Sequence, residues 1–589
     1  MCQNEKWYRY HGLERILPQV HPSSVRHTFA HAALLAAFMA VPAFAADDAP
    51  RAMSRQDLED VLRVAPSWPA TGALPAPIAL AATWDRTLVL GTYAAAAASL
   101  RAHGVLAVLG PSLEVARDPR RGRIEETFGE DAYLVGEMGV MAITGLQRRQ
   151  RDGSRVVAAA TGYAGPGLPR GGAGTSPMSE RELRQVYLAP FAKAITRAGL
   201  AAIVPSRNEM GGIPSHANRW LLQDVLRGEL HFTGAVMAEP EGIADLTGVY
   251  RIASNTQDAT RLANAAGVGV IGAIVPAPAR IEVRPAVALR AATRAVVLLK
   301  NDGALPLAVP RGPRIRIALV EVGDARAMVD AIREQARDRV EIVAPADAER
   351  VVVIVGNEAT DTQRRAAEQA ASGRPVIAVF AGDRPAVAPA LAYHAGAVVG
   401  AWARGPQGPR AVAGILLGDE EPGGKLPMTI ARSAGQLPLF HDAKPSSRRG
   451  YLFGPNEPLF PFGFGLSYTT FEIGPPRLSA QEVNGVGSVT VWVDVRNTGT
   501  RMGDETIQLY VREKVSPVTR GTQQLAGFER VSVGPGQTRT VKLVLVARDL
   551  ALWDANMKHF VIPGEYEVMT GPDSAHLQSA ALNVKEGAR

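Results

Sequence analysis

The sequence predicts a multidomain protein that combines a (β/α) barrel-like domain, an α/β sandwich domain and a C-terminal β-sandwich. Three observations lead to this prediction. Short apolar runs alternate with helix-like segments up to about residue 290, and a second alternating stretch covers residues 314–430. From about residue 476 the pattern changes to strict two-residue alternation. A chain of 589 residues is long enough for about three such domains.

A leader is predicted at the N-terminus. Residues 26–45 join a basic flank to an apolar run that ends in Ala-Phe-Ala, the pattern of a secretory signal peptide. We therefore expect cleavage near Ala45, a periplasmic or secreted protein and no stable membrane span afterwards, with an uncleaved anchor as the alternative. The single cysteine, Cys2, lies in this leader, so the mature chain should hold no disulfide.

Charge and composition argue against several kinds of partner. The formal net charge of +7 is spread over the chain without a dense lysine or arginine run, so no nucleic-acid partner is expected. The eleven histidines show no metal-ligand spacing, and no metal is expected. The glycines of Gly267-x-Gly269-x-x-Gly272 follow a helix-like segment rather than a strand, so they do not indicate a dinucleotide cofactor.

The most informative stretch is residues 199–246. An apolar run leads into the polar loop Ser206-Arg207-Asn208-Glu209, a helix-like segment follows, and a second apolar run ends at Glu239. A (β/α) barrel presents catalytic groups at the carboxyl ends of its strands, although buried strands also often end in an acidic turn residue. On an extended backbone Glu241 would share a face with Glu239, so either carboxylate could point into the site.

Several motifs of the chain resemble glycoside hydrolase family 3, the β-glucosidase and β-xylosidase type. The resemblance covers about residues 74–585 and rests on the segments around 118–134, 199–239, 292–307, 402–427 and 451–471. It implies that Glu239 occupies the nucleophile position and that Arg123 holds sugar hydroxyls, a task that suits a planar five-donor group. Asn208 and Glu209 are expected to bind substrate, a β-linked oligosaccharide or glycoside.

The chain departs from the family pattern at the site itself. Ala238-Glu239-Pro240 stands where the family has Ser-Asp-Trp or Ser-Asp-Tyr, and Thr161-Gly162 replaces a sugar-binding Lys-His pair. Losing donors that strengthen in the transition state is expected to lower the rate by more than about 10⁴-fold. The acid/base residue is expected in the short loop after the strand at 351–356, where Glu358 or Asp361 is the weak candidate.

These patterns give the predicted domain organisation and two functional hypotheses. The predicted parts are a leader at 1–45, an incomplete barrel at 46–290, an α/β sandwich domain at 291–450, a linker at 451–475 and a fibronectin type III-like domain at 476–589. The barrel is expected to be incomplete because few mature residues precede a segment that resembles a later barrel strand. One hypothesis is an exported retaining glycosidase acting on terminal non-reducing β-D-glycosyl residues. The alternative is an impaired or inactive relative that binds glycans or a partner.

Overall fold

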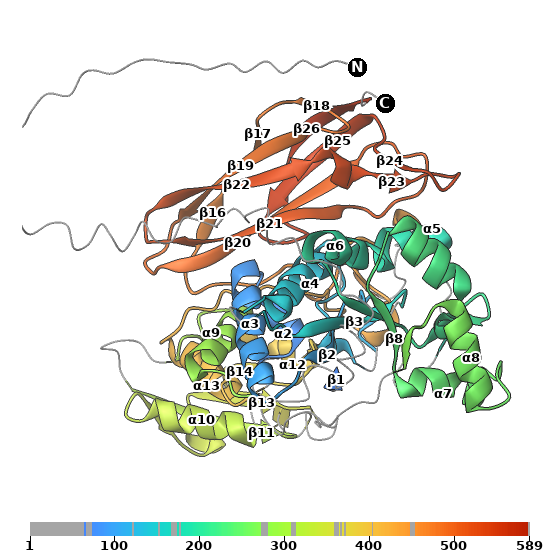
Figure 1. The fold of residues 1–589 in the computed structure, drawn as a ribbon. Helices are drawn as coiled ribbons and strands as arrows, with labels where there is room; N and C mark the ends of the chain where they lie inside the picture. The colour runs from blue at the N-terminus through green and yellow to red at the C-terminus, as the bar shows by residue number, and fades with distance from the viewer. Residues whose placement is uncertain are drawn as a thin grey trace, which may run out of the picture. The chain divides into compact units, whose positions relative to one another are not determined.

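The computed structural model describes residues 64–65, 74–120, 123–150, 153–165, 174–175, 178–271, 281–307, 314–357, 365, 368–369, 373–402, 405–447 and 454–586. All of them belong to one compact unit, Arg51–Arg589 (Figure 1). The predicted leader lies outside the described residues, and so do Glu358 and Asp361. Within the described residues, no helix combines the length and the apolar character needed to cross a membrane.

The first domain is built on a parallel sheet. Its strand order is β1-β2-β3-β5-β8-β9, every neighbouring pair is parallel, and among the described residues the sheet is open rather than closed into a ring. This confirms the prediction of an incomplete barrel-like domain. The strands are β1 (Val64–Ala65), β2 (Ala107–Ser112), β3 (Val157–Tyr163), β5 (Ala202–Pro205), β8 (Ala235–Ala238) and β9 (Val270–Ile271).

Helices connect these strands and cover the sheet. They are α2 (Pro77–Ala82), α3 (Arg86–Ala102), α4 (Ala132–Gln147), α5 (Glu180–Glu182), the π-helical η4 (Leu183–Tyr187), α6 (Ala189–Ala198), the π-helical η6 (Trp220–Glu229), α7 (Pro240–Gly248), α8 (Thr256–Ala266) and α9 (Pro285–Ala295). Because all the strands run in the same direction, the loops after them meet at one edge of the sheet.

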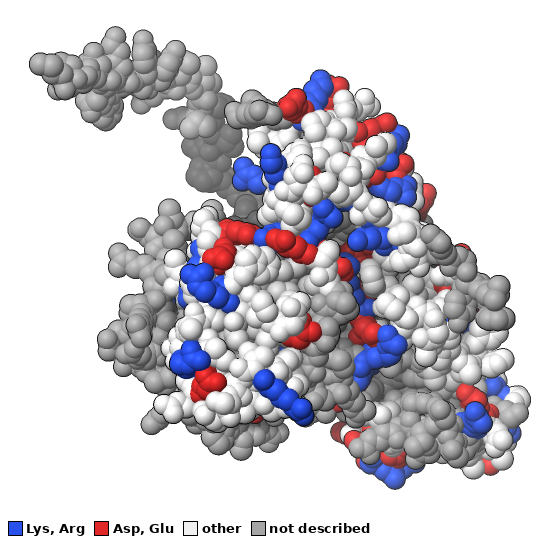
Figure 2. All heavy atoms as spheres, turned by 90° about the vertical axis from the view of Figure 1, so that its right-hand side faces the viewer, with Lys and Arg blue, Asp and Glu red and all other residues white. Residues whose placement is uncertain are grey.

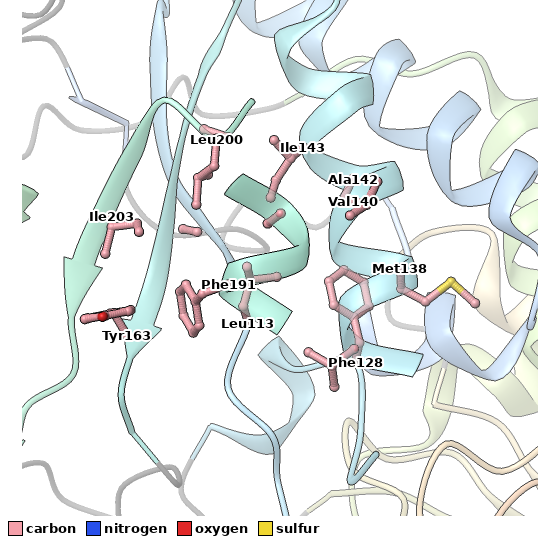
Figure 3. Packing of buried hydrophobic residues seen from close by; sticks show 14 of the residues in the cluster. Leu113, Phe128, Met138, Val140, Ala142, Ile143, Tyr163, Phe191, Leu200 and Ile203 are labelled. Carbon is pink, nitrogen blue, oxygen red and sulfur yellow. The ribbon is translucent and has the colours of Figure 1, made fainter. Parts of the chain in front are cut away.

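The core of this domain lies between the sheet and helices α4 and α6. Figure 3 shows Phe191 of α6 facing Tyr163 of β3, and the two ring centroids are 5.3 Å apart in an edge-to-face arrangement. Tyr187 and Phe191 are both buried. Removing one such ring from a packed core typically costs about 3–5 kcal/mol, so this cluster holds the helices on the sheet.

The second domain is an α/β layer structure. Its sheet has the order β10-β15-β14-β13-β11-β12, in which only β10 runs antiparallel to its neighbour. The strands are β10 (Val297–Asn301), β11 (Ile315–Val322), β12 (Val340–Ile342), β13 (Arg350–Val355), β14 (Val376–Phe380) and β15 (Ala397–Gly400), with helices α10 (Arg326–Ala336), α12 (Pro389–His394) and α13 (Gly408–Leu417). Successive side chains of β13 enter two different apolar clusters, because both faces of the sheet are covered.

The third domain is a β-sandwich. One sheet pairs β16, β19, β17 and β22, and the other has the order β18-β26-β25-β20-β21. The strands are β16 (Phe471–Ile473), β17 (Arg477–Leu478), β18 (Glu482–Asn484), β19 (Ser488–Asn497), β20 (Gly503–Glu513), β21 (Gln524–Val533), β22 (Thr538–Val546), β25 (Gly564–Gly571) and β26 (Gln578–Lys585). Val489, Val491, Val493 and Val495 of β19 are buried together, which confirms the predicted alternation.

Buried polar contacts tie the first domain to segments far along the chain. The Glu130 carboxylate accepts hydrogen bonds from the Thr429 amide and hydroxyl and from the His441 amide. Arg530 donates to the carbonyls of Thr83 and Gly423. Figure 2 shows that basic and acidic side chains are interspersed on the described part of the face it presents.

Candidate active site

Glu239 stands at the carboxyl end of strand β8, where the sequence predicted a carboxylate. The strand residues before it are buried, and Glu239 forms the N-terminal boundary of helix α7 with φ −71° and ψ 146°. Burial raises the pKa of its carboxyl above the usual range; the Arg123 charge opposes this rise and the Glu241 carboxylate adds to it. Glu239 therefore keeps its proton to a higher pH than an ordinary glutamate.

The expectation that Glu241 shares a face with Glu239 is wrong. Pro240 occupies the first position of helix α7. Proline favours this position because its φ is already helical and it has no amide hydrogen that needs a partner. Glu241 therefore lies on the first helical turn, about 200° around the axis from residue 239, and is exposed. Of these two carboxylates, only Glu239 is partly buried.

Arg123 is the cation whose charge acts most strongly on this carboxylate. It precedes the short helix η3 (Ile124–Glu126), which is anchored because Ile124 is buried in an apolar cluster with Met428. The Arg123 guanidinium pairs with Glu126 at 2.8 Å, and its charge also acts on Glu239. The structure thus brings the predicted sugar-binding arginine and the predicted nucleophile together.

A second arginine links the loop after β5 to helix α7. Arg207 pairs with Asp245 through two hydrogen bonds of 2.7 Å and 3.0 Å. Its backbone carbonyl also accepts the Tyr250 hydroxyl proton. This pair holds the helix that begins at Glu239 against the neighbouring loop. Asp245 was not among the residues predicted from the sequence, although Gly242, Asp245 and Leu246 form a buried helical stripe that could have revealed it.

Asn208 and Glu209 lie in the stretch predicted as a polar loop, and both side chains form hydrogen bonds within the protein. Asn208 is buried; its amide nitrogen donates to the Ala164 carbonyl at 3.4 Å and its amide oxygen accepts the Ser215 hydroxyl at 3.2 Å. Glu209 accepts the amide of Gly212 in the turn between β6 (Asn208–Met210) and β7 (Ile213–Pro214). Both residues shape the hairpin beside Arg207, and their contact with substrate stays a prediction.

Glu114 packs against Gly162, one of the two positions where the sequence predicts that a sugar-binding Lys-His pair is missing. Gly162 has φ +84°, and a Cβ atom there would lie 2.0 Å from Cγ and 2.5 Å from Cδ of Glu114. Glu114 is buried after strand β2, and its Oε1 is 3.5 Å from the Ser206 hydroxyl. The space beside Gly162 is therefore taken by a carboxylate side chain. No local pattern in the sequence signals this contact.

A cavity of about 430 Å³ opens beyond the carboxyl ends of β13 and β14 in the second domain. Its lining includes Asn357, Glu368, Phe380, Gly382 and Arg384. Ligands of open α/β sheets usually bind at this edge, and ligand pockets typically measure about 300–1,000 Å³. Nε of Arg384 lies 3.8 Å from Oε2 of Glu125, so the cavity lining reaches the turn that carries Arg123.

Comparison with known families gives a consistent result. Residues 67–283 match the Glycosyl hydrolase family 3 N terminal domain, residues 296–468 match the Glycosyl hydrolase family 3 C-terminal domain, and residues 505–574 match a Fibronectin type III-like domain. A β-xylosidase of Formosa agariphila is 32% identical over 87% of this chain and 88% of its own length. A periplasmic β-glucosidase of Salmonella typhimurium is 28% identical over 80% of each chain.

Solved structures agree with these relatives. A β-glucosidase from Erythrobacter marinus superimposes with a TM-score of 0.79 at 25% identity, over 88% of this chain and 86% of its own. A β-glucosidase from Listeria innocua in complex with glucose gives the same TM-score at 23% identity, over 88% and 87% of the two chains, and supports the fold alone. By its domains, its sequence relatives and its fold, the chain belongs to glycosyl hydrolase family 3.

Proposed function

We propose that this protein is an exported glycoside hydrolase that removes terminal non-reducing β-D-glycosyl residues by a retaining two-carboxylate mechanism. The observation that carries the proposal is Glu239, a carboxylate at the carboxyl end of β8 with the Arg123 charge acting on it. A retaining enzyme of this kind uses one carboxylate as nucleophile and a second carboxyl group as acid and then base, typically about 5–5.5 Å apart.

In this proposal Glu239 forms the covalent bond to the sugar. Its carboxylate attacks the anomeric carbon, while Arg123 donates to ring hydroxyls and orients the sugar. Glutamate is one methylene longer than the aspartate usual at this position, and a displacement of about 1 Å can lower a rate about a hundredfold. The Arg207–Asp245 pair limits this loss because it holds helix α7, and with it Glu239, in place.

Export is supported by the signal pattern that ends near Ala45 and by the periplasmic relative from Salmonella typhimurium. The substrate class is supported by the β-xylosidase and β-glucosidase relatives. β-Linked glycosides of glucose and xylose are therefore the first substrates to test.

A second candidate function is glycan binding without turnover. Its support is the predicted loss of the Lys-His pair at Thr161-Gly162, together with the carboxylate of Glu114, which packs against Gly162. Donors that strengthen their hydrogen bonds in the transition state contribute to rate, so their loss lowers turnover more than binding.

The deciding experiment is hydrolysis of 4-nitrophenyl β-glucoside, β-xyloside and β-N-acetylglucosaminide by the mature chain, Glu239→Gln and Glu334→Gln. Glu334 is exposed on α10 in the second domain, so its variant is a matched control for the same chemical change. The proposal would be supported if the mature chain and Glu334→Gln both turn over substrate and Glu239→Gln does not. If all three proteins stay at background, the hydrolase proposal is refuted, and binding to β-linked oligosaccharides should be measured by calorimetry.

A further inference from the structure

His216 is a buried side chain that the catalytic proposal has not used. It belongs to the short helix η5 (Ser215–Ala217), between the loop of Arg207 and helix η6. The residue is only 2% exposed, and its Nε2 has no hydrogen-bond partner among the residues that the structure describes. Burial lowers the pKa of its imidazole to about 4, with Asp245 opposing and Arg207 adding to the decrease, so the ring is neutral near neutral pH. Because buried polar atoms are nearly always paired, the presence of this ring calls for an explanation other than charge or a hydrogen bond from Nε2.

The imidazole lies directly against the backbone of helix α7. A Cβ atom at Gly242 would be 2.4 Å from Nε2, 2.5 Å from Cε1 and 3.0 Å from Cδ2 of His216. Three ring atoms at these distances leave no space for a methyl group, so this position of the helix requires glycine. The imidazole therefore sets how closely α7 can approach η5.

Helix η5, on which this ring stands, is held on both sides. The Ser215 hydroxyl donates to the Asn208 carbonyl at 3.0 Å. After η5, the side-chain oxygen of Asn218 accepts the Leu221 amide at 3.1 Å, at the start of η6. These two hydrogen bonds fix η5 between its neighbours, so the ring can resist a displacement of α7.

The contact at Gly242 reaches Glu239 through one turn of backbone. The Gly242 amide donates to the Glu239 carbonyl at 3.0 Å, and the Ile243 amide donates to the same oxygen at 3.4 Å. One turn further along, Asp245 is bound to Arg207. The ion pair draws α7 toward the loop and the imidazole limits that approach, so the two contacts together fix the position of the helix and of Glu239 at its start.

We propose that His216 is a positioning residue for Glu239, a role that rests on the proposed glycosidase function. Its imidazole acts as a spacer between η5 and α7, and through Gly242 it determines where the Glu239 carboxylate stands. A nucleophile displaced by about 1 Å can lose about a hundredfold in rate, so this spacer affects catalysis without touching the sugar.

The test removes the spacer, crowds it and replaces it. His216→Ala removes the imidazole, Gly242→Ala adds a methyl group against it, and the double variant places that methyl group in the space left by the ring. His216→Gln keeps a side chain of similar length. Leu146→Ala is the control for a loss of packing, because Leu146 is buried in the same domain near the end of α4. Helix α4 ends at the edge of the sheet where β3 begins, opposite the edge where β8 ends.

Each variant is assayed on the 4-nitrophenyl glycoside that the wild type hydrolyses fastest. The inhibition constant Ki of the released monosaccharide reports on sugar binding, and circular dichroism with a thermal melt reports on folding. The kcat/KM of His216→Ala should fall about 10- to 10²-fold, whereas Ki should change by less than about threefold because the sugar-binding groups remain. Gly242→Ala should also lose rate, and the double variant should exceed both single variants by at least about fivefold.

The two other variants separate positioning from stability. His216→Gln should stay within about threefold of wild type, because the spacer is retained. Leu146→Ala should have a lower melting temperature and an unchanged kcat/KM. A purely structural role of His216 would lower the melting temperature without the recovery of rate in the double variant.

The remaining outcomes distinguish this assignment from the glycosidase proposal. Wild-type turnover with an unchanged kcat/KM in His216→Ala, a double variant no better than either single variant, or an equal fall in Leu146→Ala overturns the positioning role alone. If His216→Ala does not fold, Gly242→Ala carries the test, and an unchanged kcat/KM there overturns the role as well. Absence of wild-type turnover on every glycoside overturns the glycosidase proposal and the positioning role with it.

Discussion

Replacing Glu130 by glutamine is expected to remove much of the pH dependence of this protein's stability. Glu130 is fully buried and accepts hydrogen bonds of 2.7 Å from both the amide and the hydroxyl of Thr429 and of 2.9 Å from the His441 amide. Burial outweighs these hydrogen bonds and raises the pKa of Glu130 from 4.5 to about 7. The folded protein therefore binds this proton more tightly than the unfolded chain does.

The sign and size of the effect follow from this difference. A carboxyl whose pKa is raised by folding contributes stability below the unfolded pKa and loses that contribution as pH rises through the folded pKa. The full difference between the folded and unfolded pKa of Glu130 corresponds to about 3.4 kcal/mol in the free energy of unfolding. Between pH 8 and pH 5.5 the contribution of Glu130 to the free energy of unfolding should grow by about 2 kcal/mol.

Urea unfolding followed by tryptophan fluorescence measures this change. Wild type should have a higher midpoint at pH 5.5 than at pH 8, and Glu130→Gln should show a smaller shift between the two. Burial also raises the pKa of Asp131 to about 7, so Glu130→Gln/Asp131→Asn should show a smaller shift still. A wild-type midpoint that is equal at both pH values, or an unchanged shift in Glu130→Gln, would refute the reasoning.

Three further predictions concern the site. Gly162→Ala should lower the free energy of unfolding by about 2–3 kcal/mol because Gly162 has a positive φ and its added Cβ would collide with Glu114. Adding Glu114→Ala to this variant should recover part of the loss. An unchanged melting temperature in Gly162→Ala would contradict this close contact. Arg207→Ala should lower the free energy of unfolding by about 3 kcal/mol because it leaves the Asp245 carboxylate buried without its ion-pair partner. A double-mutant cycle with Asp245→Ala that shows no coupling would argue against the pair. The acid limb of the kcat/KM profile should lie above pH 4.5 because burial raises the pKa of Glu239; a limb at or below that pH would show that another group titrates.

The sequence by itself determined the three kinds of layered structure and the place of the main carboxylate. Buried residues recur along the chain at the spacing set by the element that carries them. Alternating valines therefore predicted β19, and the apolar run before Glu239 predicted β8. The motif around residues 118–134 then identified Arg123 as a candidate sugar-binding residue. The error at Glu241 was local as well, because Pro240 starts a helix where an extended backbone was expected.

Only the tertiary structure decided which side chains meet at the site. Glu114 reaches Gly162 from the loop after a different strand, and Arg384 of the second domain approaches Glu125 of the first. Hydrophobic periodicity reports which face of an element is buried but not which distant loop lies opposite it. The parallel sheet brings the ends of its strands to one edge, so residues far apart in the chain become neighbours there, and their charges, spacing and pKa values follow from that arrangement.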